Sequence, residues 1–182
     1  MSRSKVLFSL TGSIACYKAC QVISSLVQEG CEVQTVCTPA ALQFVGPSTL
    51  EGLTRRPVYT DMFEKKTALE HVELAQWADL SIICPASANT INKLAAGIAD
   101  NAVTTLFLAH DLSKPCLVAP AMNQAMVRHP ATQKALRTLK SWKVQVLAVG
   151  TGRLACADQG PGRLLEPEEI LAEVRRCLKR RP

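Results

Sequence analysis

The chain has 182 residues and a formal net charge of +6, and 48% of its residues are hydrophobic while 20% are charged. A chain of this size and composition predicts one domain with a substantial core, so we treat residues 1–182 as a single unit. No apolar run approaches the roughly 20 residues that a membrane-spanning helix requires, and no secretory signal precedes the first apolar segment. These features argue against a membrane protein or a secreted one.

The eight cysteines form no CxxC pair. Their spacing predicts reduced thiols in a cytoplasmic protein, most of them serving as small buried hydrophobic residues, as at Cys37, Cys84 and Cys116. The basic residues near the end of the chain have no aromatic residues between them. This pattern favours the end of a solvated helix over a nucleic-acid surface, so we expect no nucleic-acid partner.

Five short apolar segments lack strict alternation, which is typical of strands buried on both faces. They cover residues 5–10, 32–37, 79–84, 115–119 and 143–149. Helical spacing of apolar residues separates them: a helix after the first segment should end near Gly30, and another should begin at Pro167. The alternation predicts an α/β fold, a three-layer Rossmann-like or flavodoxin-like doubly wound parallel sheet.

Ligands of such sheets bind at the carboxyl ends of the strands, and polar residues follow those ends here. Gly12 and Ser13 follow the first strand, Thr38 the second, and a cluster of Ser87, Asn89 and Thr90 the third. Asn123 follows the fourth strand. Each group could cap a helix or contact a ligand, and only at the third strand do the three polar side chains favour an anion or amide site.

The fifth strand is followed by GTGRLACADQGPGRL at residues 150–164. Its four glycines and one proline predict neither a helix nor a regular strand, so we expect a flexible loop over residues 150–166 that closes over a substrate. Among the histidines, His110 and His129 are expected on the surface. His71 begins a predicted helix, a position that suits a neutral base. No metal-binding motif is present, so no metal is expected.

Several segments together resemble the homo-oligomeric flavin-containing cysteine decarboxylases. PASANT at residues 85–90, PAMN at 120–123 and ACAD at 155–158 resemble the three signatures of that family. TGSIA at 11–15, HVEL at 71–74 and GIADN at 97–101 match in the same order. The similarity covers essentially the whole chain and is strongest to the branch that decarboxylates 4′-phosphopantothenoylcysteine in coenzyme A biosynthesis.

The resemblance implies FMN bound between the subunits of a homotrimer or of a larger assembly, a trimer of trimers or a dodecamer. The positions that match the family's flavin site are Gly12, Ser13, Ile14, Thr38, Phe44, Ser87, Ala88, Asn89, Thr90 and Met122.

The resemblance also implies the reaction and its residues. FMN oxidises the cysteinyl substrate to a thioaldehyde, CO2 leaves, and the product is reduced again to 4′-phosphopantetheine. His71 would be the catalytic base, contributed by a neighbouring subunit, and Asn123 would bind the substrate carboxylate. Cys156 would donate the proton of the reductive step, with Ala155 and Asp158 beside the substrate.

The chain departs from the family pattern at two positions, where Ala157 replaces a glycine and Val127 stands at a common tryptophan position. Both changes fall near the family's substrate site, so the identity of the substrate stays open between the following alternatives. One alternative is a lantibiotic-type peptidyl-cysteine oxidative decarboxylase, which would not need Cys156. Another is a non-catalytic FMN-binding regulatory subunit, which would not need His71, Asn123 and Cys156 together. A flavin prenyltransferase fits His71 and the PAMN segment poorly.

Overall fold

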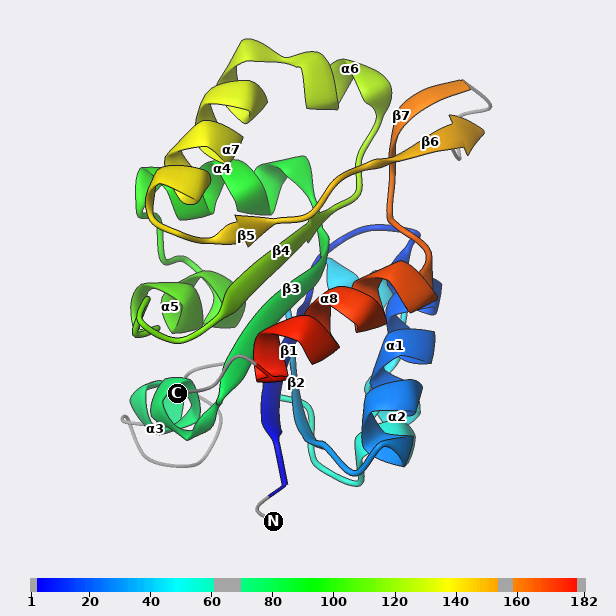
Figure 1. Cartoon of the computed structure of the whole chain (residues 1–182), viewed down its shortest axis with the longest axis vertical. Helices are drawn as coiled ribbons and strands as arrows, with labels where there is room; N and C mark the ends of the chain where they lie inside the picture. The colour runs from blue at the N-terminus through cyan, green and yellow to red at the C-terminus, as the bar shows by residue number, and fades with distance from the viewer. Residues whose placement is uncertain (1–2, 61–69, 154–158, 180–182) are drawn as a thin grey trace.

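The computed structural model describes residues 3–60, 70–153 and 159–179. A five-stranded parallel sheet has the order β2-β1-β3-β4-β5 (Figure 1), which is the strand order of flavodoxin-like doubly wound sheets. The strands are β1 (Lys5–Leu10), β2 (Glu32–Cys37), β3 (Leu80–Ala86), β4 (Cys116–Pro120) and β5 (Gln145–Val146). The predicted fold class is therefore confirmed.

The predicted strand boundaries hold best for the first two strands. The bounds of β1 and β2 agree with the prediction, and β3 and β4 are displaced by one or two residues toward the carboxyl end. The fifth strand was expected over 143–149 but pairs only at Gln145 and Val146, opposite Leu117 and Val118. It pairs with β4 alone, and apolar composition does not specify how far that pairing extends, whereas β2 at the other edge pairs with β1 along its whole length.

One face of the sheet is covered by α1 (Cys16–Gln28), α2 (Pro47–Thr54) and α8 (Pro167–Lys179), as Figure 1 shows. The helices α1 and α8 bury apolar stripes against alternate residues of the strands, among them Val6, Phe8 and Leu10 of β1. Gly30 has a φ of +86° just beyond α1, where an L-residue would be strained. The predicted end of the first helix is thus confirmed.

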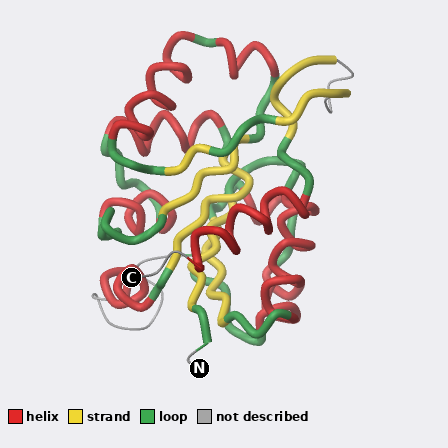
Figure 2. Tube along the Cα trace, in the orientation of Figure 1, coloured by secondary structure: helices red, strands yellow, loops and turns green. Residues whose placement is uncertain are grey.

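The opposite face carries α3 (Glu70–Trp77), α4 (Ala88–Ala96), α5 (Ala102–Leu108) and α7 (Pro130–Ser141). These helices enclose a second apolar cluster that includes Leu7, Ile83 and Val118. Figure 2 shows the helices on both sides of the central strands, which gives the three layers. Short helices at η1 (Ala41–Gln43) and α6 (Gln124–Arg128) follow β2 and β4. Among the described residues, none of the helices is both long and apolar enough to cross a bilayer.

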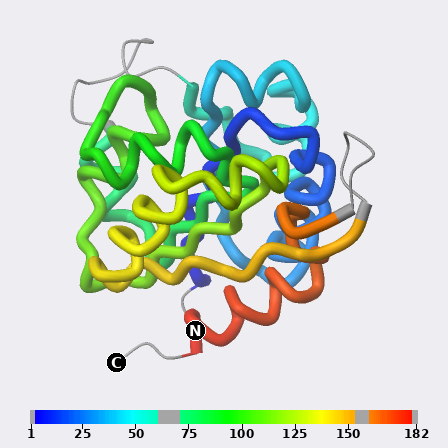
Figure 3. The backbone as a smooth tube through the Cα atoms, turned by 90° about the horizontal axis from the view of Figure 1, so that it is seen from above, coloured from blue at the N-terminus to red at the C-terminus, as the bar shows by residue number. Residues whose placement is uncertain are grey.

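The glycine-rich segment after β5 contains two strands, which corrects the prediction that it forms none. A hairpin pairs β6 (Gly150–Arg153) with β7 (Gln159–Arg163) antiparallel, outside the main sheet (Figures 1 and 3). Gly152 and Gly162 have φ values of +145° and +141°. A two-stranded ribbon has open edges, so it tolerates these glycines and a proline that a central strand would not. Residues 154–158 lie outside the described residues.

The expected surface position of His110 is wrong. His110 is 7% exposed, while His129 is exposed as predicted. His110 follows α5 directly and is adjacent to Leu7, Ser81 and Phe107, which line the same small internal cavity. Its polar sequence neighbours suggested a surface turn, but the turn at the end of α5 directs the ring inward.

Candidate functional site at the carboxyl end of the sheet

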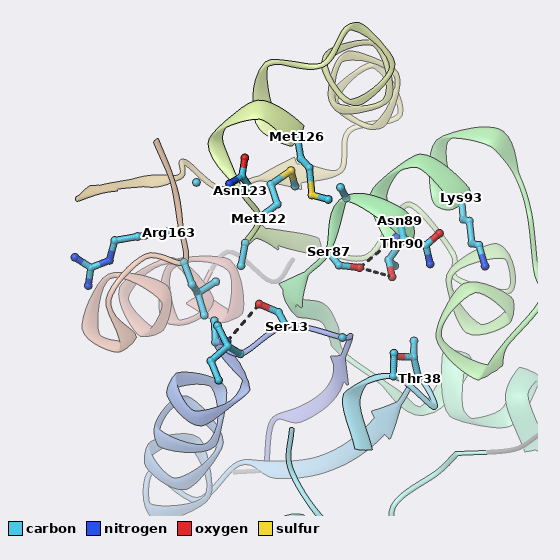
Figure 4. Close-up of a pocket in the computed structure, with 18 of the residues that line it drawn as sticks. Ser13, Thr38, Ser87, Asn89, Thr90, Lys93, Met122, Asn123, Met126 and Arg163 are labelled. Carbon is cyan, nitrogen blue, oxygen red and sulfur yellow. Dashed lines mark hydrogen bonds between the residues drawn. The ribbon is translucent and has the colours of Figure 1, made fainter. Parts of the chain in front are cut away.

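A cavity of about 1120 Å³ opens where the strand order reverses, beyond the carboxyl ends of β1 and β3 (Figure 4). Cavities for small molecules usually measure about 300–1,000 Å³, so this one has room for more than a single small ligand. Its lining comes from six loops and helix starts that are separated in the sequence. The position is the one that the doubly wound fold predicts for a ligand.

The first lining segment is the turn between β1 and α1, with Gly12, Ser13 and Ile14. A Cβ atom at Gly12 would lie 2.7 Å from the Cβ of Ala40, so the turn after β1 approaches the turn after β2 more closely than a side chain allows. Thr38 belongs to this second turn, and its hydroxyl accepts a hydrogen bond from the Ala41 N–H at 3.2 Å. The two turns together form one side of the cavity.

The second lining segment begins α4. The Ser87 hydroxyl caps the helix by accepting a hydrogen bond from the Thr90 N–H at 3.4 Å, and it also contacts the Thr90 hydroxyl (Figure 4). Asn89 is exposed beside them. The nine-residue helix presents its amino end to the cavity, where its dipole and free N–H groups favour an anion.

Thr11 joins these two segments, and the sequence analysis missed it. This fully buried side chain donates a hydrogen bond to the Pro85 carbonyl at 2.7 Å and accepts one from the Ser87 N–H at 2.9 Å. It therefore fixes the end of β1 against the start of α4. A threonine directly after a buried strand was the available signal, but its partners lie more than 70 residues away.

The third lining segment, after β4, carries Met122 and Asn123, with Met126 one turn further along α6. The Asn123 amide oxygen accepts a hydrogen bond from the Ala125 N–H at 2.7 Å, so the predicted capping role is confirmed. Figure 4 shows these three side chains on the far side of the cavity from Ser13. Val127, where the family commonly has tryptophan, is buried and does not line the cavity.

The hairpin supplies the fourth lining segment, Gly162, Arg163 and Leu164. The Met122 N–H donates a hydrogen bond to the Gly162 carbonyl at 2.9 Å. A Cβ atom at Gly162 would lie 2.2 Å from the Met122 carbonyl oxygen. The hairpin is therefore seated on the Met122–Asn123 backbone through a contact that only glycine permits.

Charged side chains lie at two places around the cavity. Lys93 forms an ion pair with Asp100, which holds the pKa of the Asp100 carboxyl below its usual value. Lys18 forms an ion pair with Glu166, and the hydrogen bond from the Lys18 ammonium lowers the pKa of the Glu166 carboxyl. Among the described residues, the cavity lining contains three cationic side chains, Lys18, Lys93 and Arg163, and one carboxylate, that of Asp100. This excess of positive charge favours an anionic ligand.

Most of the residues predicted from the sequence meet at this cavity. They are Gly12, Ser13, Ile14, Thr38, Ser87, Ala88, Asn89, Thr90, Met122 and Asn123. Phe44 does not line it and is 49% exposed. Ala155, Cys156 and Asp158 lie outside the described residues.

His71 does not line the cavity either. It is partly exposed in α3, which leads directly into the amino end of β3, whereas the cavity lies beyond the carboxyl ends (Figure 1). Helix α3 as a whole lies toward the amino end of β3, and His71 is not among the residues that line the cavity of its own chain (Figure 1). The sequence order of the motifs could not reveal this separation.

Other lining residues were not named in the sequence analysis: Ala15, Tyr17, Lys18, Pro39, Ala40, Lys93, Asp100, Asn101, Ala121 and Met126. Gly162, Arg163 and Leu164 belong to residues 150–166, the segment that was expected to close over a substrate. Asp100 and Asn101 belong to the GIADN segment, which resembles the family in sequence but to which the sequence analysis assigned no role. Among the described residues, no group of three or more potential metal ligands lies together. Cys84 and Cys116 are buried, and burial raises the pKa of the Cys116 thiol to about 12.

Comparison with known proteins shows which family this chain is similar to. The model of the Flavoprotein family matches residues 1–179. The chain is 38% identical, over 100% of its length, to the coenzyme A biosynthesis bifunctional protein CoaBC of Vibrio vulnificus. It is 43% identical, over 94% of its length, to CoaBC of Bacillus subtilis. It spans 45% and 42% of these relatives, which is less than half of their length.

Two solved structures match along their whole length. A cysteine-to-serine mutant of a PPC decarboxylase, complexed with pantothenoylaminoethenethiol, has a TM-score of 0.88 and 33% identity. The match covers 98% of this chain and 100% of that one. The FMN binding protein AtHal3 has a TM-score of 0.87 and 34% identity, with 100% of both chains covered.

Proposed function

Since the chain belongs to the Flavoprotein family, we propose that it is an FMN-dependent decarboxylase that converts 4′-phosphopantothenoylcysteine into 4′-phosphopantetheine in coenzyme A biosynthesis. One observation carries the proposal. The segments at 11–15, 85–90 and 120–123, which resemble the family's motifs, converge on one cavity although they are separated by up to about a hundred residues. The similarity to CoaBC and to the PPC decarboxylase supports the choice of substrate.

The cavity fits FMN in its size and in the distribution of its lining groups. The amino end of α4, with Ser87 and Thr90, and the turn at Gly12 and Ser13 present N–H groups and hydroxyls suited to a phosphate. Ile14 and Met122 supply apolar surface for a ring system. When bound, the flavin supplies a two-electron acceptor that later returns the electrons.

Asn123 is the proposed contact for the substrate carboxylate. Its side chain lines the cavity, and its capping bond to Ala125 fixes its orientation. An amide can donate to a carboxylate without bringing a competing charge. Binding the carboxylate next to apolar groups also favours its loss as CO2, because a charged group is less well solvated there than in water.

Cys156 is the proposed proton donor, with Ala155 and Asp158 beside the substrate. These residues lie outside the described residues, and the support comes from their place in the sequence. They stand between β6 and β7, and the root of β7 lines the cavity at Gly162 and Arg163. A thiol can deliver a proton to an enethiolate as the product is reduced.

His71 is the proposed base, and its absence from the lining of its own chain's cavity supports a site shared between subunits. We therefore propose a homotrimer, or a larger assembly of trimers, in which α3 of one subunit completes the cavity of the next. Four large apolar side chains support such an interface, since Ile14, Tyr17, Phe44 and Met126 are each about half exposed around the cavity. Phe44 would then reach the flavin of a neighbouring subunit.

The buried reduced thiols support a cytoplasmic location, where such thiols persist. The test of the function is mass spectrometry of 4′-phosphopantothenoylcysteine after incubation with the FMN-loaded protein. Loss of CO2 alone is the expected result. Loss of CO2 with two hydrogens would contradict the role of Cys156 in re-reduction. An unchanged substrate would contradict the proposed reaction, and a cysteine-terminated peptide tested in parallel would then distinguish the oxidative alternative.

A further inference from the structure

Lys18 is a buried cation in the wall of the cavity. It lies in the first turns of α1, is 7% exposed and lines the cavity. Its ammonium lies 2.7 Å from each oxygen of the Glu166 carboxylate. A lysine is almost never this buried unless its charge is paired, so Glu166 is required for the position of Lys18.

Glu166 lies between the hairpin and α8, and its backbone is fixed there. The Ile170 N–H donates to the Glu166 carbonyl at 3.2 Å, and the Glu166 N–H donates to the Glu169 carboxylate at 3.0 Å. These are the bonds of a helix start with a glutamate in its first turn. The carboxylate of Glu166 is thereby presented to Lys18 from a rigid point of the chain.

Arg163 connects the same carboxylate to the hairpin. Its guanidinium donates to Glu166 Oε1 at 3.1 Å. It also lies over β6, because a Cβ atom at Gly152 would be 2.8 Å from Nη1 of Arg163. One side chain therefore touches both strands of the hairpin and the carboxylate that holds Lys18.

The other side of β7 is seated on the segment proposed to bind the substrate. The Gly162 carbonyl accepts from the Met122 N–H, and Asn123 follows directly. A contiguous set of contacts thus runs from α1 through Lys18, Glu166 and Arg163 to β7 and Asn123. Two cations share one carboxylate, so neither can leave without disturbing the other.

We propose that Lys18, Glu166 and Arg163 are positioning residues that hold the β6–β7 hairpin in a fixed placement against α1 and the Met122–Asn123 segment. Their effect on turnover rests on the proposed function, whereas their effect on the hairpin does not. The three side chains act on the reaction through the hairpin and Asn123, and none of them is required to contact the reacting atoms.

The test uses the full-length FMN-loaded protein with three variants, Lys18→Met, Glu166→Gln and the double variant. Glu29→Gln is the matched control, because Glu29 and Arg175 form an exposed ion pair between the same two helices, α1 and α8. Hydrogen exchange of the β6 and β7 amides, thermal midpoint, flavin content, kcat and KM are measured for each.

Both single variants should increase amide exchange in the hairpin about tenfold or more, the effect of losing a charge-assisted hydrogen bond. Both should lower kcat with KM changed by no more than about threefold, and flavin content should remain that of the wild type. Glu166→Gln should also lower the thermal midpoint, because it leaves the Lys18 ammonium buried without its counter-charge.

The double variant separates positioning from simple stabilisation. It removes both charges, so the thermal midpoint should recover relative to Glu166→Gln while hairpin exchange stays fast and kcat stays low. Recovery of all three together would overturn the proposal. So would hairpin exchange equal to that of Glu29→Gln, or a KM raised by Lys18→Met alone, which would make Lys18 a substrate contact. If the wild type fails to decarboxylate, the proposed function fails, and the exchange data still decide the inference.

Discussion

Two walls of the cavity are built in different ways. The switch-point wall, formed by residues 11–13 and 85–90, continues directly from central strands and is fixed by the buried Thr11 hydroxyl and the Ser87 cap. The hairpin wall, Gly162–Leu164, lies outside the main sheet and is held by the Met122–Gly162 backbone hydrogen bond, an ion-pair network and the buried side chain of Leu164. Alterations in the first wall should therefore affect folding and flavin binding, whereas alterations in the second should affect turnover in a protein that stays folded.

The largest effect is expected at Asn123, in the segment after β4 that the hairpin wall contacts. Asn123→Asp keeps a capping oxygen for α6 but places a negative charge beside the substrate carboxylate. Repulsion between two desolvated like charges should lower kcat/KM by about 1000-fold, with little change in the thermal midpoint. Steady-state kinetics and thermal unfolding measure the two quantities. Asn123→Ser, which also caps, should be less impaired, and equal losses in both variants would contradict the electrostatic explanation.

Gly162→Ala tests how the hairpin wall is seated. The new Cβ would overlap the Met122 carbonyl at a φ of +141°, so β7 must move away. A misplacement of this kind should lower kcat by about 100-fold while flavin absorbance remains nearly that of the wild type, and the strained backbone should also lower the thermal midpoint.

The control for this change is Gly52→Ala in α2, where a Cβ meets nothing within 4 Å. It should leave activity unchanged and stabilise the helix slightly. A normal kcat for Gly162→Ala would show that the hairpin seat is not needed for turnover.

Thr11→Val tests the switch-point wall. It leaves the Pro85 carbonyl and the Ser87 N–H without their buried partner, which should lower the free energy of unfolding by about 1–3 kcal/mol and weaken flavin binding. Chemical denaturation and flavin titration check this. Thr35→Val is the matched control, since the Thr35 hydroxyl is fully buried and makes no hydrogen bond. Equal destabilisation in both variants would mean that the Thr11 bridge contributes nothing specific.

The smallest effect concerns pH and His110. Burial, and then the nearby Lys114, lower the pKa of His110, while Asp111 acts in the opposite direction. Because the folded-state pKa lies below the unfolded value, unfolding takes up a proton as the pH falls below about 6.5, and stability decreases there. His110→Phe should flatten this dependence between pH 7 and pH 5 in chemical denaturation. An unchanged slope would show that other groups govern it.

The first two strands and the helix ends could be predicted because their signals are local. Apolar runs identified β1 and β2 to the residue, and short polar side chains identified the caps at Ser87 and Asn123. The hairpin was missed because glycine and proline are read as loop formers, while an isolated two-stranded ribbon accepts them. His110 was misplaced because exposure depends on what packs over a residue, which its neighbours in the sequence do not specify.

The sequence by itself determined the α/β class and the polar turns and caps at the strand ends, because periodicity, capping and turn chemistry act within a few residues. The cofactor motifs came from the family resemblance, and ten of the 23 residues that line the cavity were named in advance. Only the tertiary structure decided that β1 and β3 are adjacent, that Thr11 therefore reaches Pro85, that Lys18 meets Glu166, and that His71 lies away from its own cavity. These contacts depend on the order in which strands pair, and that order is set by the packing of the whole chain around two apolar cores.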